Sequence, residues 1–125
     1  FFQIWGSRDE AVRVFLNAVC GGDVTIDEIK EITLRNYYFN RCVSLREGYH
    51  PSKDDYLPPR AFDEPITDKY GTTWVWNKDE LEQEKKQHYV KELKLTETGL
   101  PPREDLKRLG LDFVIPILDP MGAIG

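Results

Sequence analysis

Apolar residues recur at the 3.6-residue period of an α-helix in the first third of the chain. Between residues 8 and 19 they occupy positions i, i+1, i+4, i+5 and i+8, which form one stripe: Ala11, Val12, Phe15, Leu16 and Val19. The preceding Ser7-Arg8-Asp9-Glu10 follows the capping-box pattern, in which a serine and a glutamate side chain satisfy unpaired amides at a helix start. We predict a helix from about Arg8 to Val19, ended by Gly21-Gly22.

A second capping box, Thr25-Ile26-Asp27-Glu28, opens a longer helical pattern. This pattern continues to about Glu47, and Gly48 predicts its end. Apolar residues occur on more than one side of the predicted helix, which is typical of a helix that is buried on several faces.

Residues 49–76 show neither the helical nor the strand period. Four prolines lack the amide donors that a continuing helix or central strand needs: Pro51, Pro58, Pro59 and Pro65. We therefore expect an extended proline-rich loop, held by the aromatic side chains interspersed along it. Thr72 to Trp76 has strand propensity but no evident partner.

Helical signals return at Asn77, an N-cap for a third helix from about Lys78 to Leu93. A turn at residues 99–102 leads to a short helix from Arg103 to Leu109, ended by Gly110. Residues 113–125 are apolar and broken by proline, which predicts a loosely packed tail. The predicted fold class is all-α: one mainly helical domain over residues 1–125, an orthogonal bundle of about four helices with a long ordered loop between the second and third.

Charge and hydropathy narrow the possible partners. The net charge of -5, from 22 acidic and 17 basic residues, disfavours nucleic-acid binding because it would repel a phosphate backbone. The apolar runs are much shorter than the roughly 20 residues that span a bilayer, so we expect no membrane contact and a cytoplasmic location. The apolar start without methionine favours a segment cut from a larger protein.

Candidate chemistry is sparse. Cys20 and Cys42 are isolated and lack C-x-x-C spacing, so buried, reduced thiols are favoured over a metal pair or a disulfide. Two cysteines cannot supply the ligands of an iron–sulfur cluster. For His50 and His88, a catalytic role would also require a poised serine or cysteine with an orienting carboxylate; the sequence assembles no such set, and packing or surface roles are favoured. The loop carboxylates could bind a hard cation or act as an acid–base pair, but a similar number of cations favours an ion-pair network that fixes the loop's path. These residues are Glu47, Asp54, Asp55, Asp63 and Glu64, with Arg46, Lys53 and Arg60.

The order of short motifs resembles the carboxyl-terminal part of the tungsten-containing aldehyde:ferredoxin oxidoreductase family. In the loop these motifs are Arg46-Glu47-Gly48, Lys53-Asp54-Asp55, Leu57-Pro58 with Arg60, and Phe62 to Pro65. Outside the loop the resemblance includes Asn17-Ala18, His88-Tyr89 and the segment from Gly99 to Leu111, and it spans about Ala11 to Phe113.

The resemblance implies a helical domain of an enzyme that oxidises aldehydes at a tungsten bis-pterin site. Electrons would leave through a [4Fe-4S] cluster to ferredoxin, and the other partners would be the remaining domains of the parent chain. The family's catalytic, metal and pterin residues belong upstream, so none is transferred to this chain, and the loop motif is expected to have a structural role. The segment would complete the helical wall behind the cofactor. Two alternatives stay open: the tungstopterin subunit of a benzoyl-coenzyme A type reductase, and a free-standing helical interaction module.

Overall fold

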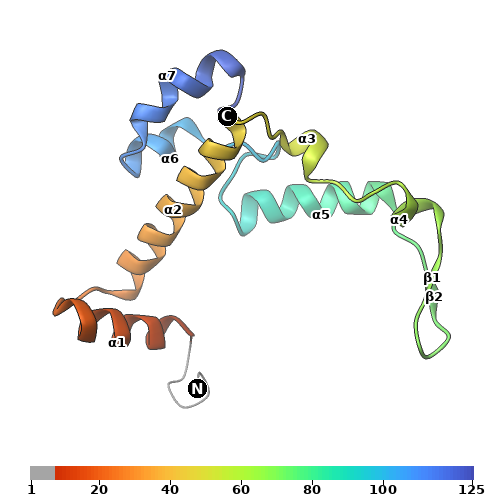
Figure 1. The fold of residues 1–125 in the computed structure, drawn as a ribbon, viewed down its shortest axis with the longest axis horizontal. Coiled ribbons are helices and arrows are strands. Elements are labelled where there is room, and N and C mark those ends of the chain that lie inside the picture. Colours follow the sequence, from red (N-terminus) through yellow and green to blue (C-terminus); the bar gives the residue numbers. More distant parts are fainter. Residues whose placement is uncertain (1–7) are drawn as a thin grey trace. The chain divides into compact units, whose positions relative to one another are not determined.

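The computed structural model describes residues 8–125, and they are mainly helical (Figure 1). The predicted capping box at Ser7 lies outside the described residues. The chain forms two compact units, residues 1–39 and 40–125, which divide within the second helix. In order, the elements are α1 (Arg8–Cys20), α2 (Ile26–Arg46), α3 (Pro51–Asp54), α4 (Arg60–Asp63), β1 (Ile66–Thr67), β2 (Thr73–Trp74), α5 (Lys78–Lys91), α6 (Arg103–Arg108), η1 (Asp112–Val114), α7 (Ile115–Leu118) and η2 (Asp119–Met121).

The first unit holds α1 and the amino-terminal part of α2. The capping box at Thr25 is confirmed: the amide of Thr25 donates to the Glu28 carboxylate at 2.8 Å, and the Glu28 amide donates to the Thr25 hydroxyl at 3.2 Å. Asn17 fixes the turn between the helices, since its side chain both donates to the Val24 carbonyl and accepts from the Val24 amide. Gly21 has a φ of +67°, the left-handed exit that the sequence predicts.

The second unit contains most of the buried apolar side chains. They come from α2, α5, α6 and the carboxyl-terminal turns, and they include Cys42, Leu45, Tyr89, Leu95, Leu106, Leu109, Leu111, Val114 and Leu118. The N-cap at Asn77 is confirmed, because its side chain accepts from the amides of Asp79 and Glu80. Leu106, Leu109 and Leu111 form the buried side of the short α6 region.

The stretch at residues 49–76 is more structured than the extended loop predicted from its prolines. Pro51 lies at the start of α3 and Pro59 is the N-cap of α4, positions where a missing amide donor costs nothing. The predicted orphan strand has a partner, because β2 pairs antiparallel with β1 in the register Ile66↔Trp74 and Thr67↔Thr73. The prolines therefore begin short helices here instead of preventing them.

Residues 112–125 also differ from the loosely packed tail that the sequence predicts. They form η1, α7 and η2, and Leu118 is 1% exposed. Pro116 and Pro120 lie in the first turns of α7 and η2, where their missing amides are tolerated. Leu111, Val114 and Leu118 repeat at i, i+3 and i+7, which places them on one buried side. Within residues 8–125, no helix combines the length and apolarity needed to cross a bilayer.

Candidate functional site

A charged side chain interrupts the buried stripe of α2. Tyr38, Cys42 and Leu45, at i, i+4 and i+7, are 0%, 3% and 2% exposed. Arg41, at i+3, lies in the same stripe, and its side chain is 12% exposed. A guanidinium that is removed from water needs acceptors for its five N–H donors, so the surroundings of Arg41 must supply them.

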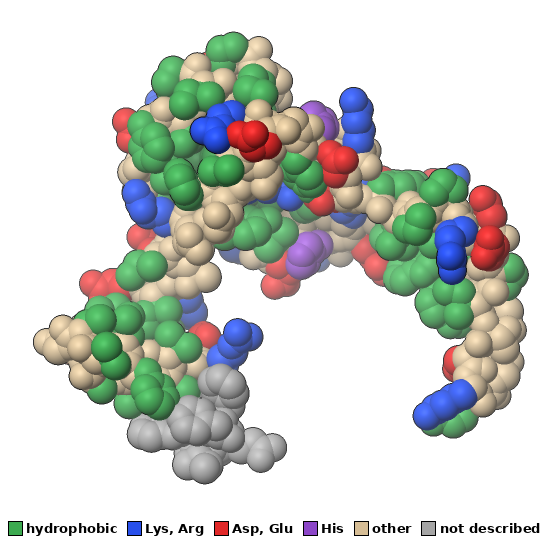
Figure 2. All heavy atoms as spheres, in the orientation of Figure 1, with side chains coloured by type: hydrophobic (Ala, Val, Ile, Leu, Met, Phe, Trp, Pro, Cys, Tyr) green, Lys and Arg blue, Asp and Glu red, His purple; other side chains and the backbone are tan. Residues whose placement is uncertain are grey.

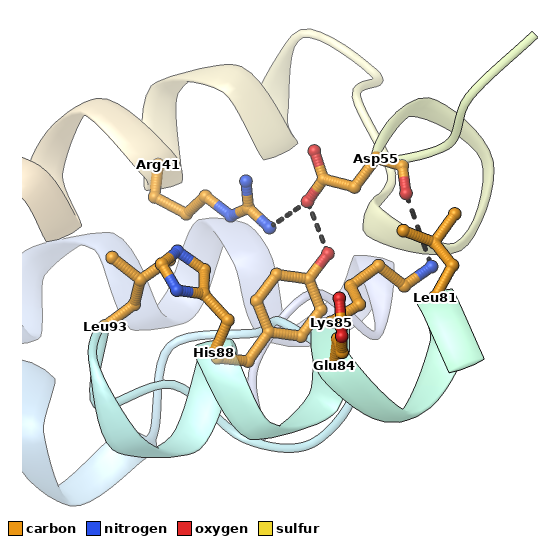
Figure 3. A pocket seen from close by; sticks show the side chains of 8 residues that line it. Arg41, Asp55, Leu81, Glu84, Lys85, His88 and Leu93 are labelled. Carbon is orange, nitrogen blue, oxygen red and sulfur yellow. Dashed lines mark hydrogen bonds and ion pairs between the residues drawn. The ribbon is translucent and has the colours of Figure 1, made fainter. Parts of the chain in front are cut away.

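Two segments supply these acceptors, residues 49–55 and the turn at Gly99, and Figure 3 shows the pair formed by Arg41 and Asp55. The Arg41 guanidinium donates to the Tyr49 hydroxyl at 2.7 Å, to the Asp55 carboxylate at 2.9 Å and, through two nitrogens, to the Gly99 carbonyl at 3.1 and 3.3 Å. It also lies over two aromatic rings, 4.7 Å from the Tyr49 centroid and 5.8 Å from that of Tyr89. Arg41 thus connects α2 with the segment around α3, with α5 and with the turn at Gly99.

Asp55 is the second centre of this network. Its carboxylate accepts from the Tyr89 hydroxyl at 2.5 Å as well as from Arg41, and its backbone carbonyl accepts from the Lys85 ammonium at 3.3 Å. Lys85 is paired in turn with Glu82 at 2.7 Å. The α5 helix is therefore tied to residue 55 at two points, one turn apart.

Local backbone geometry brings these groups together. Asp55 is the C-cap residue of α3. At the amino-terminal end of α3, the Asp54 carboxylate accepts a hydrogen bond from the His50 amide at 2.6 Å. Gly99 has a φ of +77°, and a Cβ placed there would lie 2.8 Å from the Tyr89 ring. Only glycine allows the Tyr89 ring and the Gly99 carbonyl to approach in this way.

The network shifts the acidities of its members. Partial burial alone would raise the pKa of Asp55, but hydrogen bonds from Tyr49, Tyr89 and Arg41 outweigh it and lower that pKa below the usual value. Burial together with the neighbouring Asp55 carboxylate raises the pKa of Tyr49 to about 12 and raises that of Tyr89 further. The network is therefore built from an ionised carboxylate, a guanidinium and two neutral phenols across the neutral pH range.

An open groove of about 540 Å³ lies beside the network. Its lining consists of Arg41, Asp55, Leu81, Glu84, Lys85, His88, Tyr89 and Leu93. The Arg41 and Lys85 donors that face it already have protein acceptors. In the part of the chain that the structure describes, no three His, Cys, Asp or Glu side chains gather into a metal site. The arrangement can therefore hold chain segments in place, and it presents no activated nucleophile.

The predicted loop ion pairs are mostly absent from the described residues. Arg46 pairs with its neighbour Glu47 at 2.7 Å on the surface, and Gly48 ends α2 with a φ of +95°. Lys53 and Arg60 form no ion pair within residues 8–125. Leu57 is half-buried, and the exposed Pro58 accepts from the Ala61 amide at the start of α4. Of the loop-motif residues, only Asp55 enters the network.

Sequence reasoning overlooked Arg41, although a signal for it exists. Arg41 occupies a position of the apolar stripe of α2, and a cation at such a position predicts a buried partner. The expectation for the cysteines is half right: burial raises the pKa of Cys42 to about 11, whereas Cys20, at the last position of α1, is exposed. His50 caps α3 and His88 lines the groove.

Comparison with known proteins agrees with the motif resemblance. Residues 4–111 match the family model "Aldehyde ferredoxin oxidoreductase, domains 2 & 3". The tungsten-containing aldehyde ferredoxin oxidoreductase of Pyrococcus abyssi is 32% identical over 114 residues, and that of Pyrococcus horikoshii is 34% identical over 111 residues. The alignments cover 91% and 89% of this chain but only 18% of each relative, so the chain spans about a fifth of their length. No solved structure gives a significant match. Because the family model covers most of the chain, this chain belongs to the aldehyde ferredoxin oxidoreductase family, in the part that corresponds to domains 2 and 3.

Proposed function

We propose that this chain is the carboxyl-terminal helical part of an oxidoreductase that oxidises aldehydes and passes the electrons to ferredoxin. The observation that carries the proposal is the family match over residues 4–111, which includes Asp55, the motif residue at the centre of the polar network. The matched relatives are described as tungsten-containing, which supports a tungsten cofactor for the parent protein.

The side chains of this chain do not form a ligand set for such groups. The sequence has two cysteines, one on α1 and one on α2, whereas an iron–sulfur cluster is usually held by four thiolates. No His, Cys, Asp and Glu cluster suited to a metal occurs within residues 8–125. In this proposal, the tungsten bis-pterin and the [4Fe-4S] cluster are held by other parts of the parent protein, and no chemical step is assigned to this chain.

The contribution proposed for this chain is positional. The Arg41–Asp55–Tyr89 network fixes the α3 segment and α5 against the end of α2, and such rigid support keeps neighbouring groups in place around a cofactor. The interactions are charge-assisted and the central cation is mostly buried, so the support is strong compared with surface ion pairs.

The test uses the full-length protein that contains this chain, produced without oxygen and with tungstate in the medium. We expect tungsten to copurify with the protein and aldehydes to drive reduction of ferredoxin or of a viologen dye. A protein with neither tungsten nor aldehyde-dependent reduction would contradict the proposal. Tungsten together with reductive chemistry on benzoyl-coenzyme A, and no aldehyde oxidation, would instead favour the reductase alternative.

A matched pair of variants tests the positional role. Arg41→Ala in the full-length protein is expected to lower the tungsten retained after gel filtration several-fold, because the network loses its central cation. Arg46→Ala removes an exposed cation on the same helix and should leave the tungsten content unchanged. Equal tungsten content in both variants would contradict the positional role.

A further inference from the structure

The β-hairpin has one aromatic face and one polar face. Side chains alternate between the faces of a strand, so the register Ile66↔Trp74 places Ile66, Trp74 and Trp76 on one face. We call these three residues the aromatic face. Trp74 and Trp76 confirm this placement, since their rings meet edge-on with centroids 5.5 Å apart. The opposite face carries Thr67 and Thr73, whose hydroxyls are hydrogen-bonded at 2.9 Å.

Within the residues that the structure describes, nothing fully covers the aromatic face. Ile66, Trp74 and Trp76 are 45%, 44% and 38% exposed, and every residue from 63 to 80 is exposed. The hairpin joins α4 through a hydrogen bond from the Trp76 amide to the Ala61 carbonyl, and Figure 2 shows hydrophobic side chains gathered over this region. A lone two-stranded hairpin is only marginally stable in water, and it becomes stable when a further strand or another packed element covers its apolar face.

The charges around this face indicate what covers it. Residues 63–80 include five acidic residues, Asp63, Glu64, Asp68, Asp79 and Glu80, but only two basic ones, Lys69 and Lys78. A symmetric contact between two copies of the chain would bring this exposed, net-acidic segment against itself, which is unfavourable. The complementary surface is apolar with a rim of lysine or arginine.

We propose that the aromatic face docks against an apolar, basic-rimmed segment of the parent polypeptide outside residues 1–125. This inference rests on the proposed function, in which the chain is part of a longer protein. The matched relatives are more than five times as long as the aligned segment, since it covers 18% of each. The hairpin is then an interdomain contact, with the two tryptophans as its buried anchors.

Hydroxyl-radical footprinting of the full-length protein tests the docking. The oxidation rate of each side chain is compared between native and denatured protein. Without docking, the two tryptophans are 38–44% exposed, so their oxidation rates should be about twofold to threefold lower in the native than in the denatured protein. If the aromatic face is docked, this protection factor should rise to about tenfold or more for both tryptophans. Tyr70, 81% exposed in the hairpin turn, serves as the internal control and should stay unprotected.

Protection of only two- to threefold at Trp74 and Trp76 would overturn the inference. Protection that disappears on dilution, together with a dimer, would also overturn it by identifying a second copy as the occupant. The variant D63K/E64K should reduce the protection of both tryptophans at least threefold, whereas E97K, a single charge reversal in the exposed turn after α5, should not change it. A protein that oxidises aldehydes but leaves the tryptophans unprotected contradicts this inference alone. Protected tryptophans in a protein without that activity contradict the proposed function alone.

Discussion

Residues 49–55 and residues 63–80 both combine several charged residues with one proline and at least one large aromatic side chain, yet their side chains make different contacts in the structure. In the first segment Tyr49 and Asp55 are bonded to Arg41 of α2, and Pro51 is buried. In the second segment every residue is exposed, and the hydrogen bonds of its side chains lie within the hairpin and the Asn77 cap. The difference teaches that a partner contributed by another element fixes a loop of this kind, and that composition does not.

The largest expected effect comes from removing that partner. Arg41→Ala removes the cation that pairs with the Asp55 carboxylate, and it leaves that carboxylate unpaired and largely buried. We expect the substitution to lower the free energy of unfolding of the chain by about 3 kcal/mol. Arg46→Ala is the matched control on the same helix, because its exposed pair with Glu47 contributes about 0.5 kcal/mol or less. Urea unfolding followed by circular dichroism measures both. Equal losses would mean that the network does not stabilise residues 49–55.

A glycine pair tests the close approach at the network. Gly99→Ala places a methyl group 2.8 Å from the Tyr89 ring at a left-handed backbone position, so the combined strain and overpacking should cost about 2 to 3 kcal/mol. Gly110→Ala has a similar φ of +66° but open space around the new methyl group, and it should cost about 1 kcal/mol. The difference between the two free energies of unfolding reports the contact with Tyr89. A difference near zero would show that the ring moves aside freely.

A smaller, pH-dependent effect is expected from Asp55→Asn. The pKa of Asp55 is lowered in the folded chain, so its contribution is complete above the ordinary aspartate pKa of about 4 and is lost as the pH falls through the lower folded value. The asparagine variant should lose about 1.5 kcal/mol at pH 7, and the loss should shrink as the pH falls below the ordinary aspartate pKa, until Asp55 is protonated in the folded chain as well. Unfolding titrations at a series of pH values measure this convergence. A constant difference down to pH 2 would show that Asp55 acts without its charge.

The sequence predicts the long helices and their caps because those signals are local. The Thr25 and Asn77 caps and the glycine exit at Gly48 each depend on residues within one turn, and the structure confirms all three. The Arg41 network was not predicted, because it joins residues 8 to 58 positions apart that no local pattern relates. The hairpin was missed for a different reason: its strands have two residues each, too few for a period to show. Asp68 and Gly71 were the available turn signal.

The smallest expected effect lies in that turn. The Asp68 carboxylate accepts from the amides of Tyr70 and Thr72 at 2.8 and 3.0 Å, all at exposed positions. Asp68→Ala should therefore weaken the hairpin locally by about 0.5 to 1 kcal/mol, seen as faster hydrogen exchange at the Tyr70 and Thr72 amides. The urea midpoint of the whole chain should not move, because no hydrogen bond links this turn to the Arg41 network within the described residues. A shifted midpoint would show that the hairpin and the network unfold together, and the contrast between the two segments would then be one of exposure and not of stability.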